Sequence, residues 1–202
     1  MVTEIRLYIE GGGNTKNTKA LLRSGFSQFF QGFIKKARDR KIRWNITVCG
    51  SRNDTYRDFT NALIDYPDAC NILLVDSEGP VTQTPWQHLK STDNWDSLGV
   101  SDRQCHLMVQ AMEAWFIADI EALSKFYGQK FQANSLPKST NIEKIPKDNL
   151  EPTLKAATRH TQKGEYKKIE HGCKLLALID IQKVCQASKH CQTLFEEIDK
   201  LL

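Results

Sequence analysis

Hydrophobic and polar residues alternate along the first part of the chain in a way that predicts strands and helices in turn. Residues 5–10, IRLYIE, read as a buried strand, and residues 44–48, WNITV, alternate apolar and polar side chains as a strand does. Residues 71–76, NILLVD, form a continuous apolar run, typical of a central parallel strand. Between them, residues 15–38 and 55–66 carry apolar side chains at helical spacing. This β-α-β-α-β order predicts a parallel sheet with helices on its faces.

The rest of the chain shows weaker periodicity. The elements predicted there are a long polar loop over 79–101, a strand over 106–110, a helix over 113–128, an irregular stretch over 129–149, and helices over 150–160 and 165–202. At the start of the first predicted helix, Thr15 or Asn14 is expected to act as the cap. We therefore expect an α/β core over residues 1–128 and a mostly helical C-terminal extension over residues 129–202 that packs on it.

Composition and charge narrow the class of protein. The 202 residues are 40% hydrophobic, which is enough for a core, and carry a net charge of +4. Residues 1–57 hold 12 Lys and Arg against 4 Asp and Glu, whereas residues 58–137 hold 4 against 11. A metal site within a basic rim would give this distribution, and so would an unevenly charged, solvated surface.

The sequence carries no sign of a membrane span or of export. No stretch is long and apolar enough to cross a bilayer, and the N-terminal MVTEIRLYIE is charged and strand-like, so no secretory signal is expected. The six cysteines form no CxxC pair and no Cys/His spacing typical of zinc. Buried free thiols are typical of a reducing cytoplasm, where we expect this protein to be located.

Acidic residues follow three of the predicted strands. Glu10 ends the first strand, Asp76 ends the third with Glu78 two residues further on, and Glu113 follows the fourth. The carboxyl ends of parallel strands meet at one edge of a sheet, and Asp76 and Glu78 would project to the same side of an extended segment. Neighbouring carboxylates repel unless a cation joins them, and oxygen ligands suit Mg²⁺ or Mn²⁺. Each acid alone has a structural explanation as a turn acceptor, cap or loop residue, but together they predict a metal site.

Three glycines, Gly11, Gly12 and Gly13, separate the first strand from the helix and would bring the backbone close to a partner. The stretch matches neither the phosphate-binding GxxxxGK[ST] pattern nor the dinucleotide GxGxxG pattern. The loop still leads into a helix N-terminus, which attracts anions, and Lys16 and Lys19 in its first turns would face a phosphate. A solvated helix end explains these residues equally well. Two tryptophans of the predicted loop, at 86 and 95, either stack on bases or pack inside.

Several segments carry a resemblance to known proteins. YIEGGG and LLVDSEGP resemble the Glu-Gly and Asp-x-Asp motifs of the Toprim fold, which is shared by topoisomerases, primases, small nucleases and the nucleases paired with overcoming-lysogenization-defect ATPases. The second acid of the latter motif is Glu78 here instead of Asp. CGSRNDTYRDF, MVQAMEAWFIAD and YKKIEHGCKLLALID resemble an uncharacterised Toprim-like bacterial family of about this length. Its members are often encoded beside ABC-type ATPases in apparent phage-defence loci.

The resemblance implies roles for individual residues. Glu10 would be the catalytic or metal-binding glutamate, Asp76 and Glu78 would hold Mg²⁺ and act in catalysis, and Glu113 would serve a second metal. The basic residues to which it gives a role are Lys168 and His171, which would stabilise the phosphate transition state, and Arg52 and Arg57, which would bind the nucleic-acid backbone.

Together with the carboxylates, this resemblance implies an α/β, Toprim-like (Rossmann-like) protein that hydrolyses phosphodiester bonds in DNA or RNA with Mg²⁺ or Mn²⁺, as the effector of a phage-defence system. A second hypothesis is a non-catalytic subunit that docks to an ATPase and in which the acids are structural. A third is a Rossmann-like enzyme that binds a free nucleotide without a metal. No membrane partner is expected, and an oligomer is compatible with each hypothesis.

Overall fold

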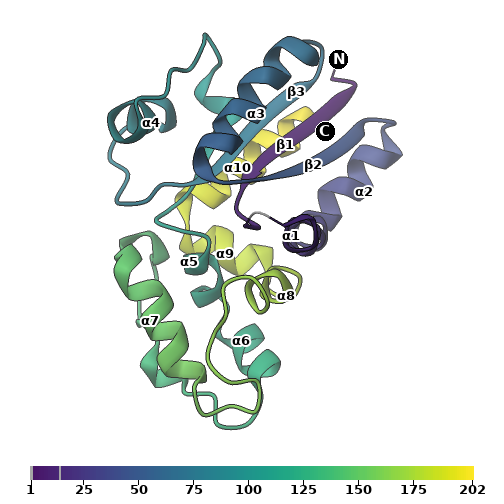
Figure 1. Ribbon diagram of the computed structural model, residues 1–202. Coiled ribbons are helices and arrows are strands. Elements are labelled where there is room, and N and C mark those ends of the chain that lie inside the picture. The colour runs from purple at the N-terminus through teal and green to yellow at the C-terminus, as the bar shows by residue number, and fades with distance from the viewer. Residues whose placement is uncertain (1, 14) are drawn as a thin grey trace.

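The computed structural model describes residues 2–13 and 15–202, and its centre is a parallel β-sheet (Figure 1). Four strands lie in the order β2-β1-β3-β4, and every neighbouring pair is parallel. The strands are β1 (Glu4–Glu10), β2 (Arg43–Gly50), β3 (Cys70–Asp76) and β4 (Cys105–Met108). The prediction of an α/β fold with a parallel sheet flanked by helices is confirmed, and the architecture is Rossmann-like.

Helices cover both faces of the sheet. The helices of the N-terminal part are α1 (Lys16–Phe29), α2 (Gln31–Asp39), α3 (Arg52–Asp65) and α4 (Pro85–Asp93). Those of the C-terminal part are α5 (Glu113–Ile117), α6 (Ile120–Tyr127), α7 (Lys147–Thr158), α8 (Gly172–Leu176), α9 (Ile181–Ala187) and α10 (Lys189–Leu201), with single 3₁₀ turns at Asp102–Gln104, Ala133–Ser135 and Ile142–Lys144. None of the described helices is long and apolar enough to span a membrane.

Alternate residues of each strand face two different cores. Leu7 and Leu74 belong to a large cluster with α1, α2 and the C-terminal helices, whereas Tyr8 and Leu73 belong to a smaller cluster with α3 and α4. The alternation follows from the two-residue period of a strand. The larger cluster runs as far as Leu202, so side chains from both predicted parts of the chain pack in one core.

The single helix predicted over 15–38 is wrong, because the helix breaks at Phe30 into α1 and α2. Phe26, Phe29 and Phe30 are all buried. Phe30 has φ −91° and ψ 10°, so the backbone leaves α-helical geometry at this residue, which ends α1 and precedes α2. The predicted cap Thr15 is confirmed, since its side chain accepts the backbone N–H of Thr18 at 3.2 Å; the alternative cap Asn14 lies outside the described residues.

The loop predicted over 79–101 contains a helix, α4. Thr84 and Gln87 form a reciprocal capping box at its start, and Pro85 occupies the first turn. The sequence Thr-Pro-x-Gln is a recognised start signal that the polar composition of the segment concealed. Trp86 and Trp95 are buried in the smaller core, so they pack inside instead of offering open stacking faces.

Side-chain caps also divide two other predicted helices. The helix predicted over 113–128 separates into α5 and α6 because Asp119 leaves helical geometry and caps α6. The stretch 165–202 holds α8, α9 and α10, with Asp180 capping α9 and Ser188 capping α10, and residues 165–171 are not helical. The fourth strand ends at Met108, two residues before the predicted end.

The strand order creates a topological switch point between β1 and β3. The chain leaves β1 through α1 and α2 on one face to reach β2, then returns through α3 on the other face to reach β3. In open parallel sheets, ligands bind in the crevice outside the carboxyl ends of the strands at such a point. Figure 1 shows this edge of the sheet directed toward α5 and α8.

Candidate functional site

Glu10 and Asp76 meet at the switch point, each as the last residue of its strand. Ile9 pairs with Leu74 in the β1–β3 register, so the two carboxyl ends lie side by side. The Glu10 Oε2 atom accepts the backbone N–H of Asp76 at 3.2 Å. Two acids 66 positions apart in sequence are therefore neighbours, as the parallel sheet requires.

Arg52 holds this pair from the first turn of α3. Its Nη1 donates to Glu10 Oε2 at 3.0 Å and to the backbone carbonyl of Asp76 at 2.6 Å. Its Nε and Nη2 donate to the two carboxylate oxygens of Asp93, in α4, at 2.6 and 2.7 Å. Ser51, which caps α3, fixes the turn from which the side chain extends. The guanidinium is therefore held between two carboxylates and a backbone carbonyl, and its side chain is only 16% exposed.

Asp76 is connected to a second group of residues on the opposite side. Its Oδ1 accepts the backbone N–H of Met112 at 2.8 Å. The next residue, Glu113, is buried, and its Oε1 accepts the Tyr166 hydroxyl at 3.2 Å and faces the Lys168 Nζ at 3.3 Å. The structure thus brings Glu10, Asp76, Glu113 and Lys168 to one edge of the sheet.

The electrostatics of the site reflect crowded negative charge. Burial, with the nearby charges of Glu10 and Glu113, raises the pKa of Asp76 to about 8. Burial also raises the pKa of Glu10, although Arg52 opposes this shift. Burial acts to lower the pKa of Lys168, but the neighbouring acids, Glu113 first, outweigh it and the pKa is raised. One carboxyl group is therefore inclined to hold a proton when no cation is bound.

Glu78 stands slightly apart from the other acids. Its φ of +64° is left-handed, so the extended geometry expected for residues 76–78 ends there. The side chain is half-exposed and forms an ion pair with Lys147, the first residue of α7. Its charge still acts on Glu10 and Arg52, so Glu78 lies at the rim of the site.

A cavity of about 260 Å³ opens beside Glu10 and Asp76, and Lys168 lies on its wall. The loop 11–13 forms another part of the wall. Gly12 is required there, because its φ is +81° and a Cβ atom would lie 2.7 Å from Val48 Cγ1. Gly12 thus packs closely against Val48 of β2, and the prediction that the glycine loop approaches a ligand stays a prediction.

The remaining predicted residues lie further out or make other contacts. Lys16 is exposed at the start of α1, while Lys19 Nζ donates to the carbonyl of Cys49 at 2.5 Å. Arg57 is exposed and pairs with Asp54 and Asp58.

His171 is buried among aromatic rings behind the site. Its Nδ1 accepts from the backbone N–H of Lys167 at 3.3 Å and lies 3.0 Å from the Tyr127 hydroxyl, and burial lowers its pKa. Since Nδ1 is an acceptor, the imidazole is neutral and carries its proton on Nε2.

A family model matches most of the chain. The family described as Domain of unknown function (DUF4276) matches residues 9–199. The chain belongs to this family. No curated protein and no solved structure matches it. The matched range takes in Glu10, Asp76 and every other residue of the site.

Three residues of the DUF4276 site were not singled out from sequence. Asp93, Lys147 and Tyr166 each contact one of its charged side chains. Asp93 was hidden because its helix was taken for a loop. The contacts of Lys147 and Tyr166 join segments 69 and 53 positions apart, and no local pattern indicates them.

Two carboxylate oxygens of the site are free to bind a ligand. Mg²⁺ in proteins is bound by one or two carboxylates and completed by water and substrate phosphate. Glu10 Oε1 and Asp76 Oδ2 receive no hydrogen bond from any described residue, and both side chains line the cavity. Over residues 2–13 and 15–202, no group of three or more His, Cys, Asp and Glu side chains is arranged to hold a metal. Glu10 Oε1 and Asp76 Oδ2 are therefore the atoms of this site that could serve as ligands to a cation.

Proposed function

We propose that this DUF4276 chain is a Mg²⁺-dependent phosphodiester hydrolase of the Toprim-like type that cleaves DNA or RNA. The observation that carries the proposal is the contact between Glu10 and Asp76 at the switch point. Each side chain there keeps one carboxylate oxygen without a donor among the described residues, and both oxygens belong to side chains of one cavity. Phosphates are the usual partners of a Mg²⁺ ion that is held by so few protein ligands.

Each residue of the site would have a separate role in the proposed reaction. Glu10 and Asp76 would hold the ion, which activates water and neutralises charge on the phosphate when it is bound. Lys168, on the cavity wall, would offset the negative charge that develops on the phosphate oxygens. The N-terminus of α1, with exposed Lys16, provides a further anion-binding surface beside the glycine loop. Arg52 would keep Glu10 in position by its bonds to Asp93.

The biological setting is proposed on the resemblance alone. A nuclease encoded beside an ABC-type ATPase would act as the effector of a phage-defence system, with the ATPase as its partner. The basic N-terminal third of the chain supports nucleic acid as the substrate, since clustered Lys and Arg attract the phosphate backbone.

One feature favours a second candidate, a docking subunit with structural acids. Glu10, Glu78 and Glu113 each have a cation of the same chain within ion-pair distance: Arg52, Lys147 and Lys168. A site balanced in this way can persist without a metal. In that case the Toprim-like fold would serve only to bind the ATPase.

Cleavage of a nucleic-acid panel tests the two candidates. Duplex DNA, single-stranded DNA and tRNA are each incubated with Mg²⁺, Mn²⁺ or chelator. We expect metal-dependent cutting by the wild type that is lost in Glu10→Gln and in Asp76→Asn. Glu151→Gln is the matched control, because Glu151 is an exposed acid of α7 paired with Lys155, and it should cut normally.

Calorimetry with Mn²⁺ separates the candidates if no substrate is cut. Mn²⁺ uptake that disappears in Asp76→Asn supports a nuclease that a partner holds inactive. Absence of uptake by the wild type, together with ATPase binding that survives Glu10→Gln and Asp76→Asn, would establish the docking subunit and overturn the nuclease.

A further inference from the structure

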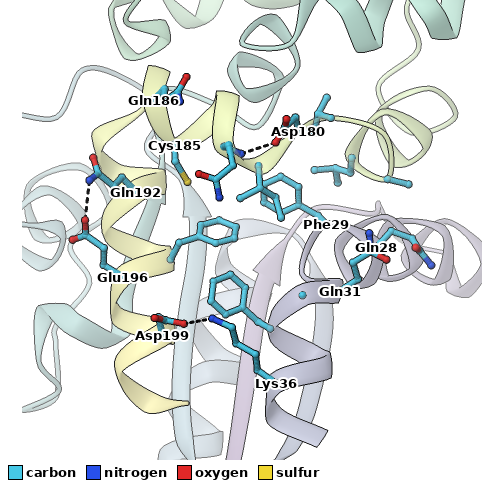
Figure 2. Close-up of a pocket in the computed structure, with 18 residues that line it drawn as sticks. Gln28, Phe29, Gln31, Lys36, Asp180, Cys185, Gln186, Gln192, Glu196 and Asp199 are labelled. Atoms are coloured by element: carbon cyan, nitrogen blue, oxygen red, sulfur yellow. Dashed lines mark hydrogen bonds and ion pairs between the residues drawn. The ribbon is translucent and has the colours of Figure 1, made fainter. Parts of the chain in front are cut away.

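A groove of about 790 Å³ lies between α2 and the pair α9–α10, away from the acidic site (Figure 2). Phe29, Phe33 and Phe195 form its apolar floor, and Lys36 and Asp199 pair across its rim at 2.6 Å. Figure 2 shows Cys185 on the wall of this groove. A small solute that enters the groove therefore reaches a thiol.

A second thiol lies beside the first. The Sγ atoms of Cys185, in α9, and Cys191, in the first turn of α10, are 4.0 Å apart. Cys185 is half-buried and Cys191 is fully buried. No other pair of cysteines in the described part of the chain has its sulfur atoms in contact. The Cys185 thiol is thus accessible from the groove, and the Cys191 thiol lies buried next to it.

The turn that carries both cysteines is fastened to the protein. Glu143 accepts the Ser188 hydroxyl at 2.7 Å and the backbone N–H of His190 at 2.8 Å through the same oxygen. Its other oxygen lies 3.1 Å from His190 Nδ1. Ser188 in turn accepts the backbone N–H of Cys191 at 3.0 Å. These bonds fasten the turn after α9 and the first turn of α10, which carries Cys191.

The two thiols also differ in pKa, and the accessible thiol has the lower one. The hydrogen bond from Cys191 lowers the pKa of Cys185, whereas burial raises the pKa of Cys191. The thiolate is the reactive form of cysteine. The accessible thiol is therefore the better nucleophile, and the buried thiol is placed to react second.

We propose that Cys185 and Cys191 form a peroxide-sensitive pair that closes into a reversible disulfide. The Cys185 thiolate attacks one oxygen of hydrogen peroxide; the O–O bond breaks, hydroxide leaves, and the sulfur becomes a sulfenic acid. Cys191, as its thiolate, then attacks this sulfur; the S–S bond forms, the S–O bond breaks and a second hydroxide leaves. The two protons released by the thiols convert the hydroxides to two waters. To form the bridge, the two sulfur atoms need to approach from 4.0 Å to about 2.0 Å.

Peroxide titration of the purified protein tests the pair. With one equivalent of hydrogen peroxide, we expect the intact mass to fall by two hydrogen atoms and the free thiols to fall from six to four. Dithiothreitol should restore both values. Peptide mapping should place the bridge between Cys185 and Cys191 within one chain. Cys70→Ser removes another half-buried thiol that has no thiol neighbour, and it should behave as the wild type does.

Two variants separate the roles of the thiols. Cys185→Ser should lose the mass change, and Cys191→Ala should gain oxygen at Cys185 instead of a bridge. Because Cys191 is buried and its replacement can impair folding, dimedone added to the wild type during oxidation provides an independent check: it should trap Cys185. Oxidation of Cys185 to a sulfinic acid without a bridge, a bridge between chains, or a bridge that still forms in Cys185→Ser would overturn the proposal.

Discussion

Two buried aspartates of this protein, Asp119 and Asp76, have opposite environments. Asp119, 3% exposed, accepts the backbone N–H groups of Ala122 and Asp180 and the Nζ of Lys183, at 3.2, 2.9 and 2.8 Å. Asp76, 7% exposed, accepts a single backbone N–H, from Met112. Burial acts to raise both pKa values, but the donors around Asp119 outweigh it and its pKa is lowered, whereas the pKa of Asp76 rises to about 8.

The difference separates a carboxylate whose two oxygens are both hydrogen-bonded from one that keeps an oxygen without a hydrogen bond from the described residues. A buried carboxylate whose oxygens are all bonded stabilises the fold. A buried carboxylate with a free oxygen, placed beside other acids, costs stability until a cation or proton arrives. Asp119 ties α5 and α6 to the start of α9, while Asp76 keeps an oxygen available for a ligand.

The largest expected effect is the loss of stability on removing the satisfied carboxylate. Asp119→Ala leaves two backbone N–H groups without their acceptor and removes one of the two carboxylates that bind Lys183, so we expect the free energy of unfolding to fall by about 4 kcal/mol. Denaturant titration at pH 7 measures this change. Glu121→Ala is the matched control: Glu121 binds the same Lys183 amine, but its side chain is 88% exposed, so its loss should leave stability unchanged. Equal effects of the two changes would contradict the comparison.

At Asp76, in contrast, we expect removal of the carboxylate charge to raise the free energy of unfolding. The pKa of Asp76 is raised in the folded state, so the folded protein binds this proton more tightly than the unfolded chain between about pH 4 and pH 8. Binding of this proton stabilises the folded state, so the free energy of unfolding falls as the pH rises from about 4 to about 8. Asp76→Asn keeps an acceptor for Met112 and removes the charge, so it should be more stable than the wild type at pH 8.

The pH dependence of that difference is the decisive control. At pH 4 the carboxyl group is protonated in the folded wild type, so the two proteins should unfold at nearly the same denaturant concentration. An Asp76→Asn variant less stable than the wild type at pH 8 would mean that the carboxylate is satisfied there, as Asp119 is.

A divalent cation that binds the Asp76 carboxylate should also stabilise the folded protein, but by a smaller free energy. An ion that binds the folded state at ten times its dissociation constant stabilises it by about 1.4 kcal/mol. We expect Mg²⁺ or Mn²⁺ to raise the thermal midpoint of the wild type at pH 8 and chelator to reverse the rise. Asp76→Asn should not respond. A shift of equal size in both proteins would place the ion elsewhere on the molecule.

The sequence predicted those residues of the site whose positions follow from the strand order. It did not predict those that reach the site through tertiary contacts. Glu10 and Asp76 end adjacent parallel strands, so their approach follows from the sheet alone. Asp93 was missed because hydrophobic periodicity is weak in α4, although its capping box was present in the sequence. The contact of Lys147 with Glu78 depends on how α7 packs against the sheet edge, which no local pattern encodes.

Glu78 provides the finest test of the comparison, because it is an acid of the same edge that is half-exposed and paired with Lys147. Exposed ion pairs contribute little, so Glu78→Gln should change the free energy of unfolding by less than about 0.5 kcal/mol at both pH 5 and pH 8. Lys147→Gln should match it, and the double variant should show almost no coupling. If Glu78 nevertheless binds the cation, its loss will weaken Mn²⁺ binding in calorimetry without this change in stability. A large loss of stability would instead assign Glu78 to the structural class of Asp119, and an unchanged Mn²⁺ affinity would leave Glu10 and Asp76 as the two protein ligands.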